Sequence, residues 1–144
     1  MVFLILIGAA VFTLVFRGFG GEELVQGFFE RMNLGPQGAM LLVMIVIFLL
    51  GFILDFIEIT FVVVPVVGPI LLAMGFDPVW LAILLAINLQ TSFLTPPFGF
   101  SLFYLRGVAD ESIKTTDIYK GVVPFIIIQL AVLLAVIVFP AFVL

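Results

Sequence analysis

The chain has 144 residues, of which 65% are hydrophobic and 10% are charged, and its formal net charge is −4. Soluble domains are roughly half apolar and a quarter charged, so this composition predicts a protein whose solvent is lipid. The absence of cysteine and histidine excludes disulfides, thiol catalysis, histidine metal sites and histidine proton shuttles, and no basic stretch could follow a nucleic-acid backbone.

The first predicted element is an apolar helix over residues 1–16. It could pass for the apolar part of a signal peptide, but no Lys or Arg precedes it and no small-residue cleavage site follows it. A helix of this length spans about 24 Å, which is less than the roughly 30 Å of the hydrocarbon core. We therefore expect residues 1–16 to be the end of a transmembrane helix, with upstream sequence missing.

Residues 17–38 are polar and are predicted to form an amphipathic arm or connecting segment. Leu24, Val25, Phe28 and Phe29 recur at helical spacing beside several charged residues. This pattern is typical of a helix that lies in the membrane interface. A solvated loop with one or two helical turns is the alternative.

Residues 39–74 are predicted to form a helical hairpin, because the apolar run is too long for one span. Asp55 and Glu58 interrupt it, and each half is a little short for a full crossing. Two short helices that meet at a tip between Gly51 and Glu58 describe a re-entrant hairpin. Two complete, tilted spans are the alternative.

Residues 78–105 are predicted to form a broken transmembrane helix. Pro78 suits a first helical turn, where its missing N–H costs nothing. Pro96 and Pro97 then remove two backbone donors and push Thr95 out of helical geometry. The helix is expected to break there and to resume as a second short helix.

The remaining residues are read as a loop over 106–120 and a last span over 121–144, with Pro124 in its first turn. The loop carries three cations, against two in residues 17–38. The positive-inside rule therefore places the loop in the cytoplasm and the C-terminus outside. The cations of the loop are Arg106, Lys114 and Lys120.

Polar side chains at membrane depth usually face a cavity or a partner, and here they form two groups. One is the pair Asp55 and Glu58, which would share a helix face if the tip is helical. The other runs from Asn88 to Thr95, directly before the two prolines. Secondary transporters use such a break, next to a hairpin tip, to hold Na⁺ and a carboxylate substrate.

Less specific interpretations remain open for both groups. The two prolines could form a purely structural kink, and the acidic pair could lie at a water-exposed turn between ordinary spans. A hydrolase pair of carboxylates is disfavoured because no polar cleft accompanies it. Without histidine, cysteine or a convincing acid–base pair, no catalytic residue is assigned and an enzyme is not expected.

Two runs, GFILDFIEITFVVVPVVGPILLAMGFDPVW and INLQTSFLTPPFGFSLFYLRGVA, resemble the C-terminal region of TRAP transporter large permeases of the DctM family. The details of the second run are similar to the branch labelled mannitol/chloroaromatic type. The positions that carry the resemblance are Gly51 and Asp55, Pro65 and Pro69, Gly75–Trp80, and Asn88 through Thr95, Pro96 and Pro97 to Gly99.

The resemblance implies an all-α polytopic membrane protein with an ion-transporter-type elevator fold. This chain would supply the second inverted repeat: the hairpin 39–74, the broken helix 78–105 and a last scaffold span. It further implies Na⁺-driven uptake of organic acids across the bacterial inner membrane, with Na⁺ as the coupling ion and no other cofactor. The expected partners are a small four-helix membrane subunit and a periplasmic substrate-binding protein.

Two departures from the family pattern are relevant. The chain is about a third of a family member's length and lacks the first repeat, so we expect that it does not transport alone. Glu58 stands where many members have an apolar or small residue, and it could pair with a cation or a scaffold arginine. Another secondary carrier, a channel subunit or a non-transporting structural fragment of similar architecture remains an alternative.

The site hypothesis combines the hairpin tip with the helix break. Backbone carbonyls near Gly51, the hydroxyls before the break and the carbonyls freed by the prolines would bind Na⁺. The candidate Na⁺ residues are Gly51, Asp55, Thr91, Ser92, Thr95, Pro96, Pro97 and Gly99. The candidates for substrate contact or coupling are Glu58, Asn88 and Gln90.

Overall fold

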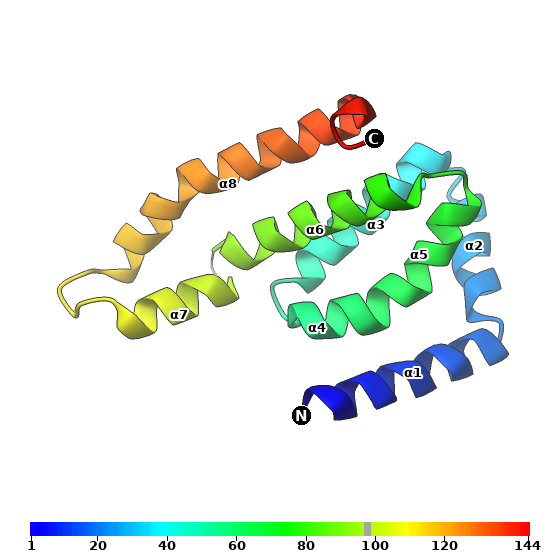
Figure 1. Ribbon diagram of the computed structural model, residues 1–144, viewed down its shortest axis with the longest axis horizontal. Coiled ribbons are helices and arrows are strands. Elements are labelled where there is room, and N and C mark those ends of the chain that lie inside the picture. The colour runs from blue at the N-terminus through cyan, green and yellow to red at the C-terminus, as the bar shows by residue number, and fades with distance from the viewer. Residues whose placement is uncertain (97–98) are drawn as a thin grey trace. The chain divides into compact units, whose positions relative to one another are not determined.

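The computed structural model describes residues 1–96 and 99–144, and in these two ranges the regular elements are all helices (Figure 1). Within the described residues, two helices are long and apolar enough to cross a membrane, Phe56–Ala73 and Thr115–Val138, and a bent pair at the N-terminus could form a third span. The predicted all-α polytopic membrane class is therefore confirmed.

The chain divides into two compact units. The first unit comprises Met1–Ile47 and Leu54–Asp77, and the second comprises Phe48–Ile53 and Pro78–Leu144. Residues 48–53, which include the beginning of the predicted hairpin tip, thus belong to the same unit as the C-terminal half of the chain.

The first unit contains five helical segments and most of a sixth. The bounds of these helices follow the changes in composition, since apolar runs form the helices and Gly, Asn and Asp residues separate them. The segments are α1 Val2–Gly18, α2 Gly21–Arg31, α3 Pro36–Leu50, α4 Phe56–Glu58, the π-helix η1 Ile59–Val63 and α5 Val64–Ala73.

Helices α1 and α2 meet at an angle of 66°. Gly20 has a φ of +71°, which favours glycine. A Cβ added at Gly21 would lie 2.5 Å from the ring of Phe16, so this ring packs directly on the glycine backbone. Arg17 Nε and Glu22 Oε1, 2.6 Å apart, form an ion pair across the bend.

The second arm of the hairpin is one continuous helical run from Phe56 to Ala73, about 27 Å long. It begins at Phe56, which lies inside the tip predicted between Gly51 and Glu58, because Asp55 caps the helix. A π-helical turn precedes Pro65, which lies in the first turn of α5. A proline ring clashes with the carbonyl one turn before it, and a wider turn relieves that clash.

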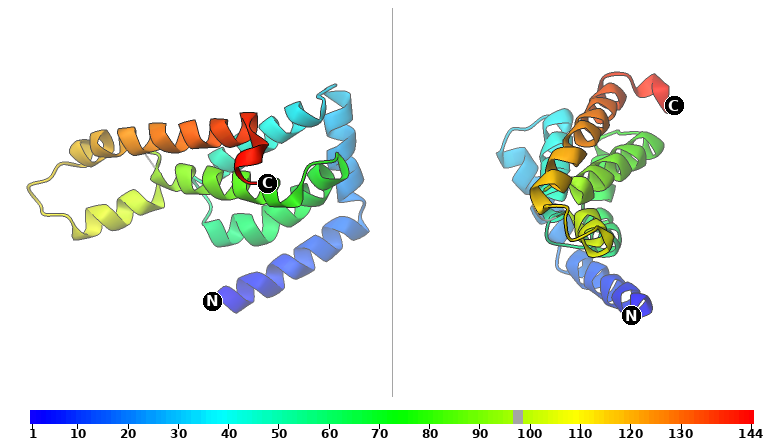
Figure 2. Two further views of the ribbon diagram at one scale, coloured as in Figure 1. Left: turned by 45° about the horizontal axis from the view of Figure 1, so that its top comes forward. Right: turned by 90° about the vertical axis from the view of Figure 1, so that its left-hand side faces the viewer.

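The second unit contains the interrupted helix and the last long helix. Its segments are α6 Pro78–Leu94, α7 Phe100–Val108, α8 Thr115–Val138 and the 3₁₀-helix η2 Pro140–Phe142. Figures 1 and 2 show that α6 and α8 run side by side in opposite directions. At the end nearest α7, a small apolar cluster of Leu102, Ile118 and Val122, with Leu94 packed against it, joins the three helices.

Helix α8 begins at Thr115 rather than at residue 121. The polar residues before the apolar run contain no proline or glycine that would stop the helix, and Lys114 has the extended backbone of a cap. Pro124 therefore lies inside the helix and not in its first turn as predicted.

The loop between α7 and α8 is ordered by two hydrogen bonds. Arg106 Nη1 donates to the carbonyl of Ile113, and the backbone N–H of Ser112 donates to Asp110 Oδ1 over 2.8 Å. The hydrogen bonds from Ser112 hold the pKa of Asp110 below its ordinary value.

Candidate functional site

One face of α6 carries the polar group that the sequence singled out. Asn88 lies three and four residues before Thr91 and Ser92, and Thr95 lies four and three residues after them, which places all four on one side of the helix. Asn88 is 3% exposed, and Thr91 and Ser92 are 0% exposed. Gln90 is exposed, because two residues of helix turn it about 200° from Asn88. The structure therefore does not bring Gln90 to this face.

The hydroxyl groups of this face donate to their own helix. Thr91 Oγ1 donates to the carbonyl of Ile87 over 2.7 Å, and Thr95 Oγ1 donates to the carbonyl of Thr91 over 2.7 Å. Ser92 Oγ donates to the carbonyl of Leu89 over 2.9 Å. Each hydroxyl oxygen keeps lone pairs after it has donated its proton. These oxygens can therefore accept a hydrogen bond or bind a cation.

Helix α6 ends at Leu94, just before the two prolines. In a regular helix, residues 96 and 97 would donate to the carbonyls of Ser92 and Phe93, and proline cannot do so. The Ser92 carbonyl instead accepts from the N–H of Thr95 over 3.1 Å, which tightens the last turn. Pro96 is partly buried, whereas Pro97 lies outside the described residues.

Gly99 allows the chain to turn back closely after the break. A Cβ at this position would lie 2.4 Å from the carbonyl oxygen of Phe93 and 3.0 Å from that of Thr95. Two backbone carbonyl oxygens therefore converge beside Gly99, which also precedes the first residue of α7.

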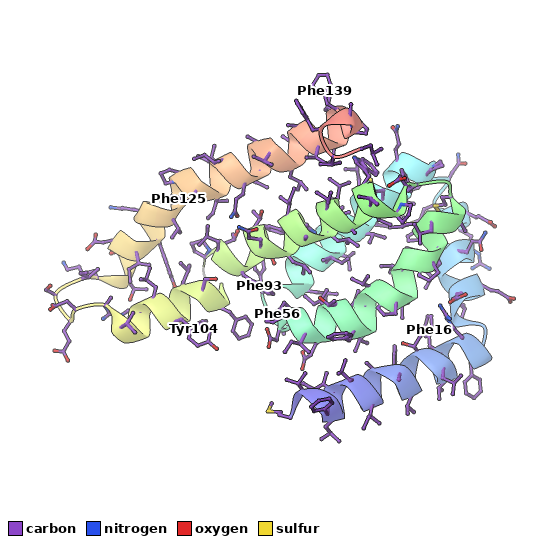
Figure 3. The ribbon with its side chains drawn as sticks, in the orientation of Figure 1. Phe16, Phe56, Phe93, Tyr104, Phe125 and Phe139 are labelled. Carbon is purple, nitrogen blue, oxygen red and sulfur yellow. The ribbon has the colours of Figure 1, made fainter. Side chains whose placement is uncertain are left out.

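Aromatic packing holds α7 against the end of α6. The rings of Phe93 and Phe100 meet edge to face, with centroids 6.3 Å apart. Figure 3 labels Phe93 at the end of α6 next to the break. This contact fixes the first turn of α7 close to the polar end of α6.

The hairpin tip reaches the polar face at Gly51. A Cβ at Gly51 would lie 2.0 Å from Ser92 Oγ and 2.9 Å from Ser92 Cβ, so the tip backbone lies directly on the serine. Gly51 itself is buried. The structure thus brings together Gly51 and Ser92, two of the predicted site residues that are 41 positions apart (92 − 51) in the sequence.

Asp55 does not lie inside a helix, which the shared helix face considered from the sequence would require. Asp55 is the N-cap of α4, with an extended backbone, and its Oδ1 accepts from the N–H of Phe56 over 2.7 Å. Glu58 lies in the first helical turn. This arrangement of Asp at the cap and Glu three residues later is a capping pattern, and it gives Asp55 a structural role within the first unit.

The donor atoms of the candidate site are hydroxyl and carbonyl oxygens. Among the described residues, no group of three or more Asp, Glu, His or Cys side chains could hold a metal ion. Uncharged oxygens are suited to a monovalent hard cation, as carbonyl ligands are in K⁺ channels. The sequence had suggested such donors, because proline cannot donate to the carbonyl one helical turn before it.

Comparison with known proteins gives one family. A family profile described as the DctM component of the tripartite ATP-independent periplasmic transporter matches residues 1–142. No solved structure gives a significant match.

Several curated relatives are similar to the chain. The isethionate TRAP transporter permease of Oleidesulfovibrio alaskensis is 35% identical over 95 residues, covering 66% of this chain and 15% of the relative. The sialic acid large permease of Vibrio cholerae is 28% identical over 142 residues, covering 99% of this chain and 33% of the relative. The C4-dicarboxylate large permease of the same species is 31% identical over 108 residues, covering 73% of this chain and 23% of the relative. The chain thus spans about a third or less of the length of these relatives.

Proposed function

Because the chain belongs to the DctM family of tripartite ATP-independent periplasmic transporter permeases, we propose that its hairpin tip and interrupted helix form a Na⁺ site. Binding of Na⁺ there would drive uptake of an organic acid. The observation that carries this proposal is the contact of Gly51 with Ser92, which puts the tip backbone on the buried hydroxyl face of α6.

The proposed ligands are oxygens that this region already concentrates. Thr91, Ser92 and Thr95 contribute hydroxyl oxygens, and Phe93 contributes a carbonyl oxygen that lies beside Gly99. Loss of water from Na⁺ must be offset by several such ligands. Carbonyls of the tip around Gly51 would complete the coordination.

Coupling would follow from shared structure. A bound Na⁺ that touches both the tip and α6 holds them together, so it favours the state in which the substrate pocket is complete. The start of α7 lies beside the same break, and the partial positive charge of a helix N-terminus favours an anionic substrate group.

The assembly is proposed from the same family membership. We place the chain in the inner membrane of a bacterium, with a small membrane subunit and a periplasmic substrate-binding protein as partners, and with an elevator motion. The resemblance implies that the last helix is a scaffold span, and a second arrangement follows from its contacts. Helix α8 packs against α6 and α7 in one compact unit, so we propose that it accompanies α6.

Replacing Thr95 tests the proposed site. Thr95→Val removes the hydroxyl and preserves the shape, so we expect the Na⁺ concentration for half-maximal stabilisation of the assembled transporter to rise about tenfold. This corresponds to the loss of roughly 1.4 kcal/mol of binding energy. Thr95→Ser keeps the hydroxyl and is expected to remain close to wild type. The measurement is thermal unfolding in increasing NaCl, with choline chloride holding the ionic strength constant.

Thr60→Val is the matched control, because Thr60 is an exposed residue of a membrane helix in the first unit. It should leave the Na⁺ dependence unchanged. If Thr95→Val also leaves it unchanged, Thr95 is not a ligand. Separate uptake assays identify the substrate class. They use isethionate, sialic acid and C4-dicarboxylates, the substrates that the names of the relatives give.

A further inference from the structure

We propose that Trp80 and Pro140 together form a latch that fixes the start of α6 to the end of α8. The indole N–H of Trp80 donates to the carbonyl of Val136 over 2.9 Å, and this hydrogen bond is buried. It joins residues that are 56 positions apart in the sequence.

Pro140 explains why this carbonyl can accept from a side chain. In a regular helix the carbonyl of Val136 would accept from the backbone N–H of residue 140, and proline has none. The preceding bond is still made, since the N–H of Phe139 donates to the carbonyl of Ala135 over 2.8 Å. Trp80 therefore supplies the donor that Pro140 withholds.

The surroundings of the bond make it costly to lose. Trp80 is 7% exposed and Val136 is 5% exposed, so water cannot easily replace the indole as donor. A buried carbonyl without a donor is destabilising. The bond is thus expected to be worth more than an exposed hydrogen bond of the same length.

The latch lies at one end of an antiparallel helix pair that is also held at its other end. There Leu94 packs against the cluster of Leu102, Ile118 and Val122. Helix α6 is therefore attached to α8 near both of its ends, and its polar residues lie between these attachments or next to one of them. Trp80 is a positioning residue in this arrangement, because it touches none of the proposed ligands.

A change at position 140 distinguishes the hydrogen bond of Trp80 from its apolar packing. If Trp80 acts only through its apolar bulk, restoring a backbone donor at position 140 changes nothing. If the hydrogen bond is what counts, Pro140→Ala allows α8 to extend through Phe139, which now caps its C-terminus, so that residue 140 donates its N–H to the carbonyl of Val136 and compensates for the loss of the indole. A double-mutant cycle separates the two cases.

The experiment compares W80F, P140A and W80F/P140A in the assembled transporter. W80F is expected to lower the unfolding temperature by several degrees. P140A is expected to remove at least half of that loss when it is added to W80F. The matched control is W80F/P124A, because Pro124 is also inside α8 but precedes Val136, so its replacement cannot supply the missing donor.

The positioning role rests on the proposed Na⁺ site and is measured separately. W80F should raise the half-saturating Na⁺ concentration about three- to tenfold, and P140A should restore it to within about twofold of wild type. Equal penalties for W80F in the wild-type, P140A and P124A backgrounds would overturn the latch. Rescue of stability without any effect on Na⁺ would preserve the latch and contradict its positioning role.

Should W80F fail to accumulate, the two double variants decide the question. Accumulation of W80F/P140A but not of W80F/P124A supports the latch. Equal accumulation of both, or failure of both, contradicts it. These outcomes do not depend on Na⁺ binding, so they remain informative if the proposed function is wrong.

Discussion

Gly51 and Ser92 are the residues whose contact joins the hairpin tip to the interrupted helix. The space between them is so small that a methyl group at Gly51 would lie 2.0 Å from Ser92 Oγ. The glycine is therefore required by close packing and not by an unusual backbone angle, since Asn33, Gly20 and Gly75 are the positive-φ residues found in the described ranges.

Gly51→Ala is expected to displace the tip and to abolish Na⁺-dependent stabilisation. Adding Ser92→Gly removes the two atoms closest to the new methyl group and leaves the Phe48 carbonyl oxygen at 3.4 Å, so the double variant should recover most of the unfolding temperature without recovering full Na⁺ affinity. Gly8→Ala is the control, because nothing lies within 4 Å of a Cβ at Gly8. The three proteins are compared by thermal unfolding with and without Na⁺. If the contact between Gly51 and Ser92 contributes nothing to stability, Gly51→Ala will have the same unfolding temperature as Gly8→Ala.

Residue patterns predicted part of this site. The Pro-Pro pair and the hydroxyl-rich run before it were sufficient to locate the end of α6 and its polar face. The contact between Gly51 and Ser92 could not be predicted in detail, because it depends on the tertiary packing of the tip. Gln90 was included on the basis of its polarity alone, and helical geometry places it on another side of α6.

At the scale of elements, Asp55 at the hairpin tip has two possible roles, as a helix cap or as an ion ligand. Its carboxylate accepts from the N–H of Phe56 and caps the helix that runs to Ala73. Capping requires an acceptor atom but not a negative charge. An ion ligand or a coupling residue would instead depend on the charge.

Asp55→Asn is therefore expected to retain stability, whereas Asp55→Ala should cost about 1 kcal/mol of unfolding free energy. Denaturant or thermal unfolding of the assembled transporter measures both. Thr60→Val, in the turn that follows α4, reports the effect of an unrelated change. A large loss of Na⁺ affinity in Asp55→Asn, with stability preserved, would contradict the capping interpretation and return Asp55 to the ligand set.

The boundaries of the elements were less predictable than their types. The long apolar runs gave helices, because their backbone groups must be satisfied within the segment. The start of α8 at Thr115 and the start of α4 at Phe56 were missed. Helix α8 extends into the polar residues 115–120, which composition assigns to a loop, and α4 occupies residues 56–58, which the sequence assigned to the tip.

At the scale of the whole molecule, the two compact units divide the hairpin. The first arm of the hairpin belongs mostly to the first unit, whereas residues 48–53, which include Gly51, belong with α6, α7 and α8. Composition indicated a polytopic membrane protein, but it could not indicate which helices pack together. That grouping depends on specific contacts, such as the bond from Trp80 to the carbonyl of Val136.

The central claim is that one Na⁺ holds the tip and the helix break at the same time. Hydrogen–deuterium exchange of the assembled transporter, in NaCl and in choline chloride, tests it most directly. We expect Na⁺ to slow exchange in residues 48–54 and 91–99 together, and we expect Thr95→Val to abolish the protection of both segments. Equal exchange of these segments in the two salts, or protection of one segment without the other, would contradict the account.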